Sequence, residues 1–381
     1  MNEKQFALFR LCLAKDIGFA RLENLLSVFE TAENVLKASK QELLSVERIG
    51  EKIADSIISA AKSDTAQKEL ELADKHKIQI LLCTDEQYPE VLKNYPDSPP
   101  LLYIKGALLP QDFNSVSIVG ARKPTHYGKT ATEQFASYFA QKKITIVSGL
   151  ARGVDCIAHK AALDNNSRTV AVLGNGLLIN YPPENAKLQA KIPENGAVIS
   201  EFPLNFPPDK GNFPRRNRII AALSKATLIT EAALPSGTLI TAKICAEYGK
   251  DVFAVPGNVY GELSQGTNYL IKHGAFPALS PKDVYEQIFE EHSSGGHCPQ
   301  SSGGQEQSSF DNEKKAFAEP EDKTENEVFK LISEYENGTH IDLISQKVNI
   351  DISDIAAILL KLEIDGLIKT LPGQIYVKRQ V

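Results

Sequence analysis

Residues 144–153 read ITIVSGLARG, an apolar β-branched run that ends in small and polar residues. Upstream, residues 128–142 have helical periodicity with Ala131 and Phe135 on one face, and residues 115–119 (SVSIV) form another β-branched run. A strand, a helix and a second strand in this order, with near-continuous apolar strands, are typical of a parallel sheet covered on both faces. The stretch therefore predicts a doubly wound α/β domain.

The same alternation continues through the middle of the chain. The predicted strands are Ser115–Val119, Ile144–Val147, Thr169–Leu173, Ala197–Ser200, Thr227–Thr230 and Val252–Val255. We expect them to form a Rossmann-like, mostly parallel sheet within a domain over residues 66–288. Ligands of such sheets bind beyond the carboxyl ends of the strands.

Residues 1–65 are predicted to form a separate helical domain. Short helices joined by hydrophobe-Gly segments, at Ile17-Gly18 and Ile49-Gly50, resemble a tandem helix-hairpin-helix (SAM-like) module, whose hairpin amides contact phosphates. Arg48 stands where the second hairpin usually has its first glycine, and residues 1–104 carry 13 basic and 17 acidic side chains. Contact with DNA and contact with a protein therefore both stay open for this domain.

Residues 289–322 are polar and rich in Gly, Ser and Gln, which predicts a flexible linker. Residues 323–381 follow a winged-helix pattern of three helices and a hairpin. The expected helices are 327–335, 340–347 and 352–365, and the expected strands are 367–370 and 374–377. The third helix carries Asp354, Glu363 and Asp365 but only Lys361, which favours a protein contact over DNA reading.

Composition narrows the class of protein. The 381 residues carry a net charge of −6, but residues 105–286 hold 20 basic and 14 acidic side chains, so the middle is locally basic. The sequence has no apolar run of 18 residues and no signal-peptide pattern, which predicts a cytoplasmic protein without a membrane span. Five scattered cysteines and isolated histidines predict no disulfide framework, metal site or cofactor.

Glycines and small polar residues gather where the predicted strands end. Glycine admits a ligand close to the backbone, and helix N-termini offer free N–H groups to anions. The turns after four strands therefore predict a phosphate ligand. The candidate residues are Gly120, Arg122, Ser148, Gly149, Arg152, Gly174, Gly176, Gly237 and Thr238. Ile179 breaks the dinucleotide pattern after Gly176, and the chain has no P-loop motif.

Residues 210–218 read KGNFPRRNR and add an aromatic ring and four cations. Phe213 could stack on a base, while Lys210, Arg215 and Arg218 could grip phosphates. The alternative is a helical N-terminal turn whose arginines pair with carboxylates of the same chain.

The order of these motifs resembles the DprA/Smf family of DNA-processing proteins. The resemblance rests on the motifs SIVGAR (117–122), SGLARGVD (148–155), AVLGNG (171–176), FPRRNRII (213–220), SGTLITA (236–242) and VFAVPG (252–257). It implies a protein without catalytic residues that binds single-stranded DNA and loads RecA recombinase during natural transformation. It also implies a homodimer through Asn268, Leu270 and Ile271.

A rival interpretation is an enzyme. Glu231 before Ser236-Gly-Thr238 resembles the sugar-phosphate corner of phosphoribohydrolases, which have related folds and bind nucleotides. The chain has Leu234-Pro-Ser-Gly-Thr where those enzymes have a Pro-Gly-Gly-x-Gly-Thr loop. A scaffold acting only through its flanking domains is the third interpretation.

Overall fold

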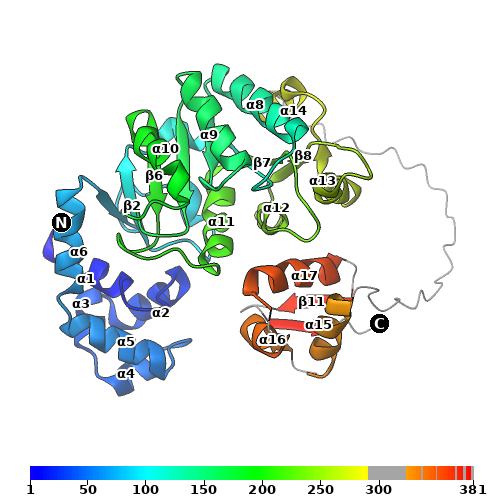
Figure 1. Cartoon of the computed structure of the whole chain (residues 1–381). Coiled ribbons are helices and arrows are strands. Elements are labelled where there is room, and N and C mark those ends of the chain that lie inside the picture. The colour runs from blue at the N-terminus through cyan, green and yellow to red at the C-terminus, as the bar shows by residue number, and fades with distance from the viewer. Residues whose placement is uncertain (291–322, 336–337, 349, 365–366, 372–374, 379–381) are drawn as a thin grey trace, which may run out of the picture.

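The computed structural model contains a helical body, a large α/β body and a small C-terminal body, in chain order (Figure 1). It describes residues 1–290, 323–335, 338–348, 350–364, 367–371 and 375–378. The linker predicted over 289–322 lies outside the described residues from position 291 onward, and so does Asp365.

Within the described residues, the central sheet has nine strands in the order β1-β2-β6-β5-β4-β3-β7-β8-β9. The run from β6 to β9 is parallel, and only β1 and β2 are antiparallel to their neighbours. The prediction of a mostly parallel sheet is confirmed. The strands are β1 (Gln79–Leu82), β2 (Leu101–Gly106), β3 (Ser115–Val119), β4 (Thr145–Ser148), β5 (Thr169–Leu173), β6 (Gly196–Ser200), β7 (Ala226–Ile229), β8 (Asp251–Ala254) and β9 (Phe276–Pro277).

Helices cover both faces of this sheet because successive strand side chains point to opposite sides. Ile146 belongs to the core on the side of α8 and α9, whereas its neighbour Val147 belongs to the core on the side of α11 and α12. The chain leaves β3 toward β4 in one direction and later returns to β7 on the other side of β3. A crevice is expected at such a switch point.

The helices of this body are α7 (Glu90–Lys93), α8 (His126–Gln141), α9 (Val154–Asp164), α10 (Ala186–Lys191), α11 (Asn212–Leu223), α12 (Gly237–Glu247), α13 (Glu262–Lys272) and α14 (Pro281–Phe289).

The N-terminal body is the expected tandem of helix-hairpin-helix units. Its helices are α1 (Glu3–Cys12), α2 (Phe19–Phe29), α3 (Ala32–Lys37), α4 (Lys40–Leu44), α5 (Glu51–Lys62) and α6 (Thr65–Lys75). Gly18 and Gly50 are the N-caps of α2 and α5. Arg48, in place of the usual glycine, adopts a φ of 65°, a left-handed conformation that non-glycine residues rarely adopt.

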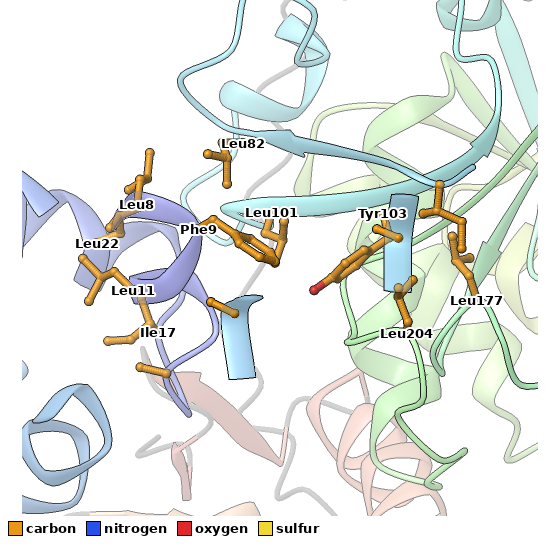
Figure 2. Packing of buried hydrophobic residues seen from close by; sticks show 14 of the residues in the cluster. Leu8, Phe9, Leu11, Ile17, Leu22, Leu82, Leu101, Tyr103, Leu177 and Leu204 are labelled. Atoms are coloured by element: carbon orange, nitrogen blue, oxygen red, sulfur yellow. The ribbon is translucent and has the colours of Figure 1, made fainter. Parts of the chain in front are cut away.

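This helical body shares its core with the sheet. Phe9 of α1 is fully buried in the same cluster as Leu101 and Tyr103 of β2 and Leu204 (Figure 2). The body also covers β1, the edge strand of the sheet, which α1 and α6 contact. An uncovered edge is a site of unwanted strand pairing, so this packing protects one side of the sheet.

The C-terminal body is a winged helix, as predicted. Its elements are α15 (Lys323–Ser333), β10 (Thr339–His340), α16 (Ile341–Val348), α17 (Ile352–Ile364), β11 (Ile368–Leu371) and β12 (Ile375–Lys378). Val328, Ile344 and Leu359 meet in its buried core. Its third helix, α17, packs against α12 of the α/β body. No helix in the described ranges is long and apolar enough to cross a membrane.

Candidate nucleic-acid interface

A cleft of about 620 Å³ lies at the carboxyl ends of the central strands. The turn after β3, the start of α11 and the start of α12 line it, together with three residues of the winged-helix domain. A smaller hollow beside it reaches the turns after β4 and β5 and shares Arg122, Tyr181 and Phe213 with the cleft. We call the two together the groove.

Arg122 and Phe213 come together in the groove although they lie far apart in the sequence. The guanidinium carbon of Arg122 is 5.8 Å from the centre of the Phe213 ring. Phe213 also stacks on Tyr181, with ring centres 5.4 Å apart and planes 26° from parallel. Arg122 is exposed and forms no ion pair with any residue in the described part of the chain. A free cation beside stacked rings suits a ligand with phosphates and bases.

The absence of a side chain at Gly174 leaves room for the Phe213 ring. A Cβ atom at this position, at the end of β5, would lie 2.8 Å from Cδ1 of the Phe213 ring. A side chain at this position would therefore displace the Phe213 ring. Gly120 serves packing in a similar way, because a Cβ there would lie 2.8 Å from the Val154 side chain of α9.

Arg216 lies under the floor of the groove, a role that the sequence did not reveal. Its Nη1 donates to the carbonyl oxygen of Gly149, at 2.7 Å, and to that of Val172. Burial lowers its pKa to about 10, although nearby Asp155 opposes this shift. Burial likewise raises the pKa of Asp155, against the attraction of Arg216. Through these two hydrogen bonds, Arg216 joins the ends of β4 and β5 from below.

Three of the buried residues that were predicted to contact the ligand already donate hydrogen bonds within the protein. Ser148 is fully buried and donates to the carbonyl of Ile118, 2.6 Å away. The amide of Gly149 donates to Asp155 (3.1 Å), and the amide of Gly176 donates to the carbonyl of Phe206 (2.9 Å). The expectation that the Gly149 amide receives a phosphate does not fit this geometry, because the amide is already engaged.

The remaining predicted arginines pair with carboxylates of the same chain. Arg215 and Arg218 each place Nη2 2.8 Å from Oε2 of Glu201, and Arg152 holds both carboxylate oxygens of Glu184. None of the three faces the main cleft. For Arg215 and Arg218, the structure therefore agrees with the alternative given by the sequence, in which arginines in the first turns of a helix pair with carboxylates of the same chain.

Lys210 and the start of α12 do line the main cleft. Lys210 is exposed and pairs with Asp351 of the winged-helix domain. Gly237 and Thr238 open α12, where a Cβ at Gly237 would meet nothing within 4 Å. The first amides of a helix face outward and attract anions. Lys123, an exposed residue of the groove that the sequence motifs did not single out, directly follows Arg122.

Glu231 is a structural residue of the first turn. Its side chain is 2% exposed, and its two oxygens accept from the amide of Thr125 (2.8 Å) and from the Thr125 hydroxyl (2.5 Å). Thr125 in turn is the N-cap of α8. The carboxylate is thus engaged in holding the start of a helix. No group of three or more potential metal ligands gathers within the described residues.

The residues predicted for a dimer contact lie on α13. Asn268 bonds both the amide and the carbonyl of Gly257, at 3.2 and 3.1 Å, so it holds a neighbouring loop. Leu270 is half-buried and packs on the sheet core, whereas Ile271 is half-buried outside the core clusters. Exposed Phe276 of β9 and Leu279 follow directly, with 41% and 74% of their surface accessible.

Comparisons with protein families match the three bodies in turn. The family described as DNA recombination-mediator protein A matches residues 79–289. A DprA winged helix domain matches residues 312–374, and a SAM-like helix-hairpin-helix tandem matches residues 11–64.

Individual relatives span most of the chain. Protein Smf of Synechocystis is 35% identical over 96% of both chains. DNA processing protein DprA of Streptococcus pneumoniae is 38% identical over 70% of this chain and 93% of its own length.

Two solved structures are similar as well. The crystal structure of the S. pneumoniae protein has a TM-score of 0.65 and 32% identity, and covers 76% of this chain and 99% of its own. A structure of DNA processing protein A from Helicobacter pylori, described for its single-stranded DNA binding mode, has a TM-score of 0.51 and 32% identity. It covers 56% of this chain and 97% of its own.

Proposed function

The chain belongs to the DprA/Smf family of DNA-processing proteins, and from this premise we propose that its groove binds single-stranded DNA without reading base sequence. The observation that carries the proposal is Arg122, which has no ion-pair partner among the described residues, beside the stacked rings of Phe213 and Tyr181. A base from one strand can insert on such a platform, whereas the bases of a duplex are already stacked on one another.

In the proposed complex each group has a separate task. Phe213 stacks on a base, which contributes about 1–3 kcal/mol and tolerates any sequence. Arg122, Lys123 and Lys210 neutralise phosphates, and the amides that open α12 donate to another phosphate oxygen. Arg216 touches no DNA in this scheme and holds the turns of Gly149 and Val172 in place.

The proposal is tested by fluorescence anisotropy with labelled oligothymidylate over a range of salt concentrations. Arg122→Ala should weaken binding and flatten the log–log salt dependence by about 0.7 for each phosphate that the protein no longer neutralises. Phe213→Leu should weaken binding about 5- to 150-fold with little change in slope, because it removes stacking but no charge. Lys191→Ala, an exposed cation at the end of α10, is the matched control and should change neither quantity.

Two results would count against the proposal at different levels. If Arg122→Ala leaves affinity and slope unchanged, the strand lies elsewhere on the protein. If the wild-type protein prefers a duplex to a single strand of the same length, the ligand itself is wrong.

We propose further that the protein acts without catalysis, as a cytoplasmic mediator that loads RecA onto incoming DNA in natural transformation, and works as a homodimer. The family's description as a recombination mediator supports the RecA partner. The engaged carboxylate of Glu231 argues against ribose chemistry at this corner. RecA filament formation on strands coated with a single-strand-binding protein measures the mediator step, and release of base from nucleoside monophosphates would contradict a purely binding role.

A further inference from the structure

The winged-helix domain occupies part of the groove. Asp351, Asp354 and Ala357, at the start of α17, line the same cleft as Arg122, Lys210 and Phe213. Asp351 pairs with Lys210, one of the cations that we assign to phosphate binding. Asp354 is exposed there and adds a second carboxylate. A DNA strand in this part of the cleft would meet two negative charges and a cation that is already neutralised.

A second ion pair holds the other end of the same helix. Lys243 of α12 pairs with Glu363 near the end of α17, and both side chains are about three-quarters buried. Burial raises the pKa of the Glu363 carboxyl, but hydrogen bonds from Lys243 and Thr370 outweigh this effect and keep its pKa below the ordinary value. Between the two ion pairs, α17 packs along α12. Helix α17 is therefore fixed to the α/β body at both of its ends.

The charge of α17 fits this position and suits a DNA groove poorly. In a winged helix the third helix is the one that usually enters a major groove, yet here its described residues include Asp354 and Glu363. Its lysine, Lys361, is held by both oxygens of Glu325, at 2.5 and 2.7 Å. The exposed charges at the start of α17, those of Asp351 and Asp354, are thus acidic and complement the basic groove.

We propose that the winged-helix domain is an intramolecular competitor of single-stranded DNA: Asp351 and Asp354 at the start of α17 close the groove, Glu363 anchors the other end of this helix on α12, and DNA binding requires this domain to leave. This inference rests on the proposed function of the groove. The ion pair of Asp351 with Lys210 is exposed and therefore weak, so a DNA strand, or a protein that binds Asp351 and Asp354, can displace the start of α17. The domain thereby lowers the apparent affinity of the groove for single-stranded DNA.

The test uses the full chain with neutral, shape-conserving variants. Asp351→Asn keeps a side chain that can cap α17, and Glu363→Gln keeps an acceptor for the amide of Thr370. The double variant should bind oligothymidylate about three- to tenfold more tightly than the wild type. Glu327→Gln, an exposed acid on α15, is the matched control and should leave the affinity unchanged.

Lys243→Gln gives the sharpest result, because two effects predict opposite signs. Removal of a positive charge from the α/β body should weaken DNA binding by simple electrostatics, whereas release of Glu363 should strengthen it. Tighter binding by Lys243→Gln supports the competitor. Weaker binding by this variant, or an equal gain in Glu327→Gln and in the double variant, would overturn it.

A DNA-independent measurement separates this inference from the proposed function. The radius of gyration from small-angle X-ray scattering should increase in the Asp351→Asn/Glu363→Gln variant without DNA. If the radius of gyration increases but neither the wild type nor any variant binds single strands, the contact between the domains is supported and the assignment of the groove to DNA is wrong. If it stays unchanged while the wild type binds DNA, the competitor is wrong and the groove assignment stands.

Discussion

His159 shows how a single buried residue ties the stability of the groove to pH. It lies fully buried on α9, with Nδ1 2.6 Å from the hydroxyl oxygen of Thr169 on β5. Burial and, to a lesser degree, the positive charge of Arg216 lower the pKa of His159 to about 3. The folded protein therefore keeps this imidazole neutral at pH values where an unfolded chain would protonate it.

The sign of the resulting pH dependence follows from proton binding. An unfolded histidine takes up a proton below about pH 6.5, whereas folded His159 does not, so the free energy of unfolding falls as the pH falls. Between pH 6.5 and pH 5 we expect His159 to account for a loss of about 2 kcal/mol. Urea denaturation at both pH values measures it.

His159→Gln should remove this part of the pH dependence. His126→Gln, at the exposed start of α8, is the control and should retain it. An identical pH dependence in wild type and His159→Gln would contradict the buried neutral imidazole.

At the level of elements, α11 divides its arginines between two faces. Phe213, Arg216 and Ile220 recur at helical spacing and line the groove, whereas Arg215 and Arg218 lie on another face and meet Glu201. The run of arginines in the sequence carries no sign of this division until the start of the helix is known. One turn of helix therefore supplies both a support for the groove and a surface ion-pair cluster.

The two faces predict very different costs for the same substitution. Arg216→Met should lower the free energy of unfolding by about 3–5 kcal/mol, because it removes the donor to the buried carbonyl oxygens of Gly149 and Val172 and the positive charge that favours ionised Asp155. Arg215→Met should cost at most about 1 kcal/mol, since Glu201 keeps Arg218 as a partner. Chemical denaturation of both variants measures the difference, and equal losses would mean that buried Arg216 does not stabilise the turns.

The sequence predicted the elements better than their internal contacts. The six predicted strands are present because β-branched runs signal buried parallel strands directly. Strands β1, β2 and β9 were missed: they lie at the sides of the sheet, and β9 has only two residues. The turn after a predicted strand placed Gly120 and Arg122 at the groove, and the cationic and aromatic stretch 210–218 placed Lys210 and Phe213 there. Ser148 and Gly176 could not be recognised as buried, since glycine and serine serve packing and binding alike.

At the scale of the whole molecule, the two edges of the sheet are treated differently. The helical body covers β1 and shares one core with β2 (Figure 2). At the other edge, β9 is short, includes exposed Phe276 and is followed by exposed Leu279. A short strand limits pairing with other chains, but exposed apolar side chains beside it are typical of an interaction surface. The asymmetry points to the β9 side as the place where a second copy would dock.

The proposed dimer can be tested at this edge. Ile271→Glu and Leu279→Glu should each shift the protein toward the monomer, because a buried unpaired carboxylate costs several kcal/mol at an interface. Sedimentation velocity over a range of protein concentrations measures the shift. Val28→Glu replaces an apolar residue of α2 that is 56% exposed, far from this edge in the chain, and should leave the association unchanged. If the wild-type protein sediments as a monomer at every protein concentration, the proposed dimer is wrong. If Val28→Glu dissociates the dimer and the other two substitutions do not, the interface lies on the helical body instead.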